Sequence, residues 1–211
     1  MYPTYTRSER VADGSMHAIG VTGAVLGAIM LLVWSVPDAS PWEVTAIAVY
    51  AATLIGTFTA SAFYHMTPWE SLRPTLRRID HAAIYLKIAG TYTPLVVMIG
   101  SGLAYVVLGI VWALAVIGMV LKLVFWSTPG QLGPALYLIM GWMSVVLVWS
   151  SWEALPFGYI LAGGLLYTVG VVFHAAKNMK FANAIWHGFV VAASACFFVA
   201  ITVVTTQQTV V

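Results

Sequence analysis

The chain has 211 residues, of which 61% are hydrophobic and only 8% are charged. Soluble domains carry roughly a quarter charged residues, so the composition excludes a water-exposed globular domain. A net charge of +2 is too small to indicate a nucleic-acid-binding protein. With a single cysteine, Cys196, the chain offers no disulfide framework.

Apolar segments follow one another along the chain, separated by short polar or Pro- and Gly-containing connections. Each segment is long enough to cross about 30 Å of hydrocarbon as a helix. Unbroken apolar runs favour helices over the alternating strands of a membrane barrel. We therefore predict an all-α integral membrane protein, one domain over residues 1–211, whose seven transmembrane helices lie near 16–36, 43–64, 80–99, 102–125, 132–151, 157–175 and 183–205.

Two positions bear on the number and shape of these helices. A turn at Gly100 and Ser101 separates the third span from the fourth, and a single bent helix there would change the count. Pro94 lies inside the third span and has no N–H to continue the hydrogen-bond ladder. We expect it to kink or end that helix.

Charge placement predicts the orientation. Connections on one side of a seven-span topology contain Asp38, Glu43 and Glu153 and no Lys or Arg. The other side holds the basic residues Arg7, Arg10, Arg73, Arg77, Arg78, Lys122, Lys177 and Lys180. Because cytoplasmic loops are enriched in Lys and Arg, the amino terminus is predicted to be cytoplasmic and the carboxyl terminus outside.

The five histidines all map to the predicted cytoplasmic end of the bundle: His17, His65, His81, His174 and His187. Ionisable groups at membrane depth are costly, and they usually face the bundle interior, where they pair or bind something. Ser61 and His65 are four residues apart, as are Asn183 and His187, so each pair projects from one helix face. Their polar side chains are therefore expected to converge.

Asp80 lies at the predicted start of the third helix, where the helix dipole favours a carboxylate. Two imidazoles and a carboxylate that converge there are suited to zinc, with an acidified water in an open position. Ser61 and Asp80 would then orient or deprotonate that water. Spacing alone equally allows a structural reading, with hydrogen-bonded histidines, Asp80 as a helix cap and Ser61 bonded to its own helix.

The stretch SAFYHMTPWESLRPTLRRIDHAAIYLKIAGTYTPL, residues 61–95, resembles the signature of the hemolysin III proteins. These form the bacterial branch of the progestin and adiponectin receptor family, which is related to the alkaline ceramidases. ERVADGSMHAIG at 9–20, YTVGVVFHAAK at 167–177 and AIWHGFVVAASAC at 184–196 match as well. The resemblance implies seven helices in the bacterial cytoplasmic membrane, with a zinc site near the cytoplasmic face.

Carried over by motif, the resemblance implies His65 and His187 as zinc ligands, with Ser61 and Asp80 holding a zinc-bound water. The first histidine of the family's seventh-helix His-x3-His pair falls on Asn183, whose amide oxygen is a poor zinc ligand. Three outcomes remain open. His174 supplies the missing ligand from the sixth helix; the two histidines, Asp80 and water hold metal weakly; or the site holds no metal.

The resemblance implies a zinc-dependent hydrolase of lipid amides or esters that serves membrane lipid homeostasis. The alternatives are a non-enzymatic lipid receptor or sensor with a structural or empty metal site, and a pore-forming cytolysin. The spans show no polar face that could line a channel, which speaks against the cytolysin. The expected partners are membrane lipids and a fatty-acid or lipid ligand in the bundle. Lys87, about two turns after Asp80, is expected to reach the interface or to line an internal lipid pocket.

Overall fold

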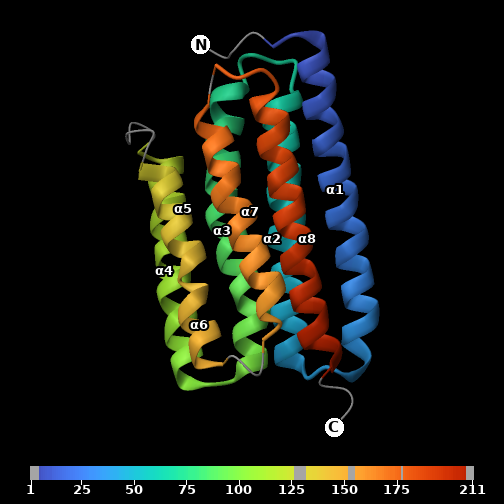
Figure 1. The fold of residues 1–211 in the computed structure, drawn as a ribbon, viewed down its shortest axis with the longest axis vertical. Coiled ribbons are helices and arrows are strands. Elements are labelled where there is room, and N and C mark those ends of the chain that lie inside the picture. The colour runs from blue at the N-terminus through green and yellow to red at the C-terminus, as the bar shows by residue number, and fades with distance from the viewer. Residues whose placement is uncertain (1–4, 126–131, 152–154, 177, 208–211) are drawn as a thin grey trace.

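The computed structural model describes residues 5–125, 132–151, 155–176 and 178–207, except for the side chains of 132–134, 148 and 207 (Figure 1). Six helices have the length and apolar composition to cross a membrane. They are α1 (Arg7–Ser35), α2 (Pro41–Met66), α3 (Arg73–Ile99), α4 (Gly102–Leu123), α7 (Phe157–Ala175) and α8 (Ala182–Gln207). Short elements complete the order: η1 (Val36–Asp38), α5 (Leu132–Trp142) and α6 (Ser144–Ser150). The predicted all-α class is confirmed, with no strand in the described residues.

Two helices begin where capping predicts. The Thr6 hydroxyl accepts a hydrogen bond from the Glu9 backbone N–H, and the Glu9 carboxylate accepts one from the Thr6 backbone N–H; α2 starts with the same capping box at Ser40. As a result α1 begins at Arg7, well before the apolar run that starts at residue 16. Its first turns carry Arg10 and Asp13 on a regular helix. Hydropathy marks membrane depth, whereas capping sets where the helix starts.

Helix α3 differs from the prediction at its start. It begins at Arg73 with Pro74 in the first turn, where proline is favoured because its missing N–H needs no partner. Asp80 therefore lies inside the helix, about two turns from its beginning. It is not at the start of the helix, where it was predicted, and it does not cap α3.

Helix α3 also passes Pro94, which does not end it. The hydroxyls of Thr91 and Thr93 donate to carbonyls one turn earlier in this stretch, as polar side chains do where a transmembrane helix is disturbed. The helix ends at Gly100, whose φ of 67° is the left-handed conformation that glycine adopts easily. The predicted turn between the third and fourth spans is confirmed.

The segment predicted as the fifth span is broken into α5 and α6. At the break, the Tyr92 hydroxyl lies 2.7 Å from the Met140 carbonyl oxygen and 2.9 Å from that of Gly141. Ser144 donates to Gly141 as well. Carbonyls that leave the helical ladder in an apolar region need such donors. The described part of the chain thus contains six long apolar helices and this seventh, interrupted one.

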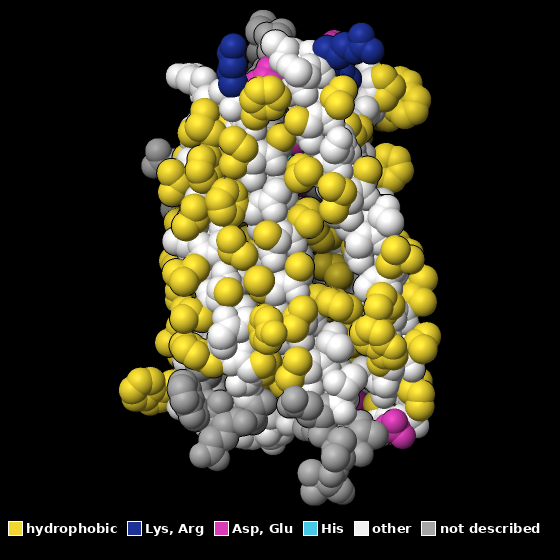
Figure 2. Space-filling view, turned by 45° about the vertical axis from the view of Figure 1, so that its right-hand side comes forward, with side chains coloured by type: hydrophobic (Ala, Val, Ile, Leu, Met, Phe, Trp, Pro, Cys, Tyr) yellow, Lys and Arg dark blue, Asp and Glu magenta, His cyan; other side chains and the backbone are white. Residues whose placement is uncertain are grey.

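One end of the bundle is strongly basic. Figure 2 shows Lys and Arg gathered at the end where α1 begins, above a belt of exposed hydrophobic side chains. We call it the basic end; it carries Arg7, Arg10, Arg73, Arg77, Arg78, Lys122 and Lys180. Lys177 lies outside the described residues.

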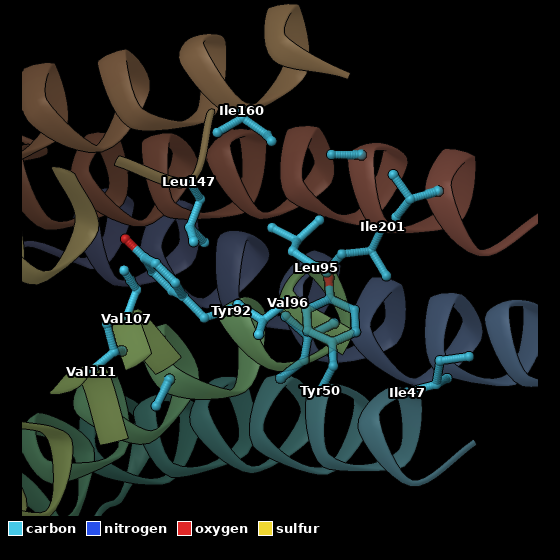
Figure 3. Close-up of a cluster of buried hydrophobic side chains, with 14 of the residues drawn as sticks. Ile47, Tyr50, Tyr92, Leu95, Val96, Val107, Val111, Leu147, Ile160 and Ile201 are labelled. Carbon is cyan, nitrogen blue, oxygen red and sulfur yellow. The ribbon is translucent and has the colours of Figure 1, made fainter. Parts of the chain in front are cut away.

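The half of the bundle away from the basic end has an apolar interior. Ile47, Val96 and Ile201 are fully buried there (Figure 3), as is Leu31 near the end of α1. Burial of each such side chain contributes about 1.5–3 kcal/mol in a water-soluble protein; between helices in lipid, close packing and dispersion supply the stabilisation instead. The buried acidic and histidine side chains lie instead in the half that carries the basic end.

Candidate metal centre

Three imidazoles from three helices meet inside the basic end. His17 comes from α1, His65 from α2 and His187 from α8, and one candidate ligand atom from each lies within 4.8 Å of the others. Their ring centroids are 4.3 Å (His17 to His187), 4.6 Å (His65 to His187) and 5.2 Å (His17 to His65) apart. His17 and His187 are buried, and the His65 side chain is 11% exposed.

A close contact between α1 and α2 sets this arrangement. Gly20 lies one turn after His17, and a Cβ on Gly20 would come within 2.5 Å of the Phe58 ring. Only glycine lets the ring of Phe58 approach the α1 backbone so closely. Helices α1 and α8 run side by side from the basic end (Figure 1), which carries His17 and His187 to the same depth.

Asp13 supplies the carboxylate among the three rings. Its Oδ1 is 2.6 Å from Nδ1 of His187, and its Oδ2 is 3.7 Å from both His17 Nε2 and His65 Nδ1. A carboxylate on one imidazole nitrogen fixes the ring orientation and leaves the other nitrogen as an acceptor. Asp13 is therefore placed to orient His187.

The group fits a metal ion. The buried Nε2 of His17 has no hydrogen-bond partner among the described residues, which costs about 1–3 kcal/mol if nothing binds it. Ligands at about 2.0–2.1 Å from a tetrahedral ion lie about 3.3 Å apart, so small side-chain rotations close the observed 4.8 Å spacing. Neutral imidazoles bind zinc, copper, iron and nickel, so the donors alone do not identify the metal.

Ser61 and Asp80 lie beside this group. Ser61 is one turn before His65 on α2, and its hydroxyl lies close enough to the buried carboxylate of Asp80 on α3 for a polar interaction. Asp80 is also close enough to His17 for an electrostatic interaction. The catalytic roles predicted for Ser61 and Asp80 stay predictions, but both side chains are near the histidines.

Asn183 and His174 each contact another residue in the structure. The Asn183 amide donates to the Tyr5 hydroxyl at 3.0 Å. The His174 ring lies against Trp186, with the centroids 5.0 Å apart. Neither belongs to the group of three close imidazoles, so in the structure His17 occupies the place for which His174 was considered. Their predicted ligand roles remain untested by any bound metal.

Sequence reasoning missed Asp13 and missed His17 as a partner of His65 and His187. A signal was present: Asp13 and His17 are four residues apart in ERVADGSMHAIG, so both project from one helix face. The predicted helix boundary at residue 16 hid it, because Asp13 then fell outside the helix.

Lys87 lies deeper in the bundle, 7% exposed. Its Nζ donates to the Tyr167 hydroxyl and to Ser194 Oγ, both at 2.6 Å, and lies 4.7 Å from the centre of the Phe58 ring. Within the described residues, no carboxylate lies within salt-bridge distance of it. The side chain thus bonds inside the bundle and connects α3 to α7 and α8.

This network gives a stability prediction. Replacing Lys87 with methionine should leave the unfolding midpoint unchanged or raise it, because removing a buried charge with similar volume is often neutral or stabilising. The hydroxyls stay paired, since Ser194 donates to the Val190 carbonyl and lies 3.1 Å from the Tyr167 hydroxyl. The Tyr167→Phe/Ser194→Ala double variant should instead lose about 3–5 kcal/mol, because it strands the ammonium group. Unfolding in detergent measures the stability of both variants. A Lys87→Met protein less stable than the double variant would contradict the prediction.

The long apolar helices and the buried polar group define a multi-pass helical membrane protein with a candidate metal centre. The sequence profile of the family described as "Haemolysin-III related" matches residues 5–198. The chain therefore belongs to the haemolysin-III family.

Two bacterial relatives and one mammalian relative show how far the similarity extends. The chain is 33% identical to a hemolysin-3 homolog of Bacillus subtilis (strain 168), over 92% of this chain and 93% of the relative. It is 33% identical to hemolysin-3 of Bacillus cereus, over 90% and 89% of the two chains. Identity to the human monocyte to macrophage differentiation factor is 29%, over 92% and 83%. These matches support the relationship to the progestin and adiponectin receptor family.

Proposed function

We propose that this protein binds zinc through His17, His65 and His187 and hydrolyses a lipid amide or ester at that site. The observation that carries the proposal is the meeting of three imidazoles around the carboxylate of Asp13, within 4.8 Å of one another. A zinc ion there supplies a Lewis acid that polarises a carbonyl group and lowers the pKa of water. Membrane lipids are the substrates within reach, and membrane lipid homeostasis is the process it serves.

The chain's own residues have distinct tasks in this proposal. Asp13 accepts a hydrogen bond from Nδ1 of His187 and holds that ring in orientation. The Ser61 hydroxyl holds the Asp80 carboxylate. An oxygen of Asp80 takes the proton of the attacking water and returns it to the leaving amine or alkoxide as the acyl–heteroatom bond breaks. Burial keeps bulk water away from these groups.

The orientation belongs to the same proposal. Because basic residues favour the cytoplasmic side, the basic end faces the cytoplasm of a bacterial inner membrane. The centre then lies at the depth of the inner-leaflet acyl carbonyls.

The Asp80→Asn variant tests the catalytic part. It should keep its fold and its metal but release fatty acid about 100-fold or more slowly, because asparagine cannot take a proton. The measurement is fatty-acid release from a panel of amide and ester lipids by zinc-loaded protein, with metal content determined on the same samples. Asp38→Asn, at the opposite end, is the matched control. Zinc-loaded wild-type protein that releases no fatty acid would contradict the enzymatic proposal.

The geometry also favours a second candidate, a lipid receptor or sensor whose metal only joins helices. The three imidazoles come from α1, α2 and α8, and the pocket beside them has room for about one water molecule. His65→Ala distinguishes the two. It should unfold a protein in which the metal is structural, but give a folded, inactive protein if the metal is catalytic.

Pore formation, which the name hemolysin-3 of the Bacillus cereus relative suggests, finds less support. The fully buried Leu31, Ile47, Val96 and Ile201 fill the half of the bundle away from the basic end. A conducting pore needs a polar or wet path through that half. Conductance of purified protein in a planar bilayer would restore this candidate.

A further inference from the structure

A small enclosed pocket leads towards the histidine group from the surface of the basic end. Its lining includes the buried Asp13 and the partly buried His65, and its volume is about 10 Å³, enough for about one water. Outside it lies a broader hollow formed by Tyr5, Arg7, Arg10, Val11 and Met66. The two spaces share Tyr5, Arg10 and Met66. Because the same three side chains border both, the inner and outer spaces are neighbours, and together we call them the path.

Two hydrogen bonds close this path. The Asn183 amide donates to the Tyr5 hydroxyl at 3.0 Å, and the Phe181 backbone N–H donates to Glu9 Oε1 at 3.1 Å. All four residues line the inner pocket. The start of α1 is thus held across the start of α8, directly over Asp13 and His65.

The backbone at this contact is strained. Phe181 has a φ of 60°, the single positive φ of a non-glycine residue in the described chain. A bulky residue in the left-handed region costs of order 1–3 kcal/mol and persists only where its surroundings hold it. Its N–H is held by Glu9. Opening the contact would release this strain.

We propose that this path is the route by which water and a hydrated divalent cation reach the centre, and that the contact between Tyr5 and Asn183 is its gate. The proposal deepens the proposed function and rests on it for the role of the cation. The inner pocket carries two carboxylates, Asp13 and Glu9, against one guanidinium, Arg10, so it attracts a cation that has passed the outer hollow lined by Arg7 and Arg10. Burial raises the pKa of Tyr5 above its usual value, so the hydroxyl stays protonated and the contact uncharged at neutral pH.

A labelling experiment tests the gate without any metal. Ala184 lines the inner pocket and is 9% exposed, so Ala184→Cys in a Cys196→Ser background places one thiol behind the gate. A small charged methanethiosulfonate should label it slowly in full-length protein in nanodiscs. Adding Tyr5→Phe should speed labelling about fivefold, because one hydrogen bond that holds the gate is lost. Tyr159→Phe, the same change on an exposed residue at the other end, should have no effect.

A control must show that faster labelling comes from an open gate and not from unfolded protein. A thiol placed by Ala200→Cys, at a fully buried position in the other half, should stay unlabelled with and without Tyr5→Phe. Equal labelling at position 184 with and without Tyr5→Phe would overturn the gate.

Metal exchange tests the cation's part of the route. Zinc-loaded protein with Asn183→Ala should lose zinc to excess chelator about fivefold faster than wild type, and Ala184→Leu, which fills the pocket, should slow the loss. Zinc loss unchanged in both variants overturns the cation route. Absence of zinc in the wild type overturns the proposed function and the cation's part of the route, while the labelling result still decides whether the gate exists.

Discussion

Replacing His17 with alanine should remove the metal that we propose the centre binds, whereas replacing His174 with alanine should leave that metal in place. His17 lies with His65 and His187 inside the basic end, while His174 lies against Trp186 and outside that group. Loss of a direct ligand should weaken binding by more than the 10–100-fold typical of changes around the ligands. Elemental analysis of protein purified with zinc, followed by a competition titration with a chromophoric chelator, measures the effect.

The two variants form a matched pair, because each removes one imidazole from a helix at the basic end. Thermal unfolding of both, without metal, shows whether either has lost its fold. Metal content that falls with His174→Ala and not with His17→Ala would return the site to the ligand set expected from the sequence. Equal content in all samples would mean that the metal binds elsewhere.

Replacing Gly90 with alanine destabilises the bundle by about 3 kcal/mol, the upper range for overpacked cores. A Cβ at this position would lie 2.0 Å from Thr53 Oγ1 and 2.9 Å from Thr53 Cβ. Helices α2 and α3 would have to move apart, and α2 carries Ser61 and His65 while α3 carries Asp80. The midpoint of unfolding in a detergent series measures the loss of stability.

Gly109→Ala is the control, since a Cβ there meets nothing within 4 Å. It should be neutral or stabilise α4 by up to about 1 kcal/mol through better helix propensity. Adding Thr53→Ala to Gly90→Ala removes the nearest atom and should restore part of the stability. A Gly90→Ala protein as stable as wild type would show that the two helices do not approach as closely as described.

Hydropathy indicates where apolar helices lie because the bilayer imposes one physical requirement on every residue it contacts. The fourth span, expected at 102–125, is α4 from Gly102 to Leu123. Two helix starts were misplaced, at the end of the bundle where the apolar pattern stops. Beyond the hydrocarbon the apolar pattern stops but the hydrogen-bonded helix continues, so α1 and α3 begin earlier than expected.

The candidate site was also predicted only in part. Spacing showed that Ser61 and His65 share a face and that His187 lies at the same depth, which the structure agrees with. Spacing could not show that α1 lies next to α8, because that arrangement depends on packing between segments that are distant in the sequence. The contact of Gly20 with Phe58 brings α1 against α2, and with it His17 and Asp13. No local pattern encodes that contact.

Asp13 and His187 are 174 positions apart in the chain, so the ribosome produces Asp13 long before His187. Synthesis at about 5–20 residues per second needs on the order of ten seconds or more to produce the stretch between them. During that time the half-formed group on α1 and α2 lacks its third imidazole. A metal bound at the proposed centre would therefore report a completely inserted chain, because the third imidazole is in place only after the last helix has left the ribosome and docked beside the first.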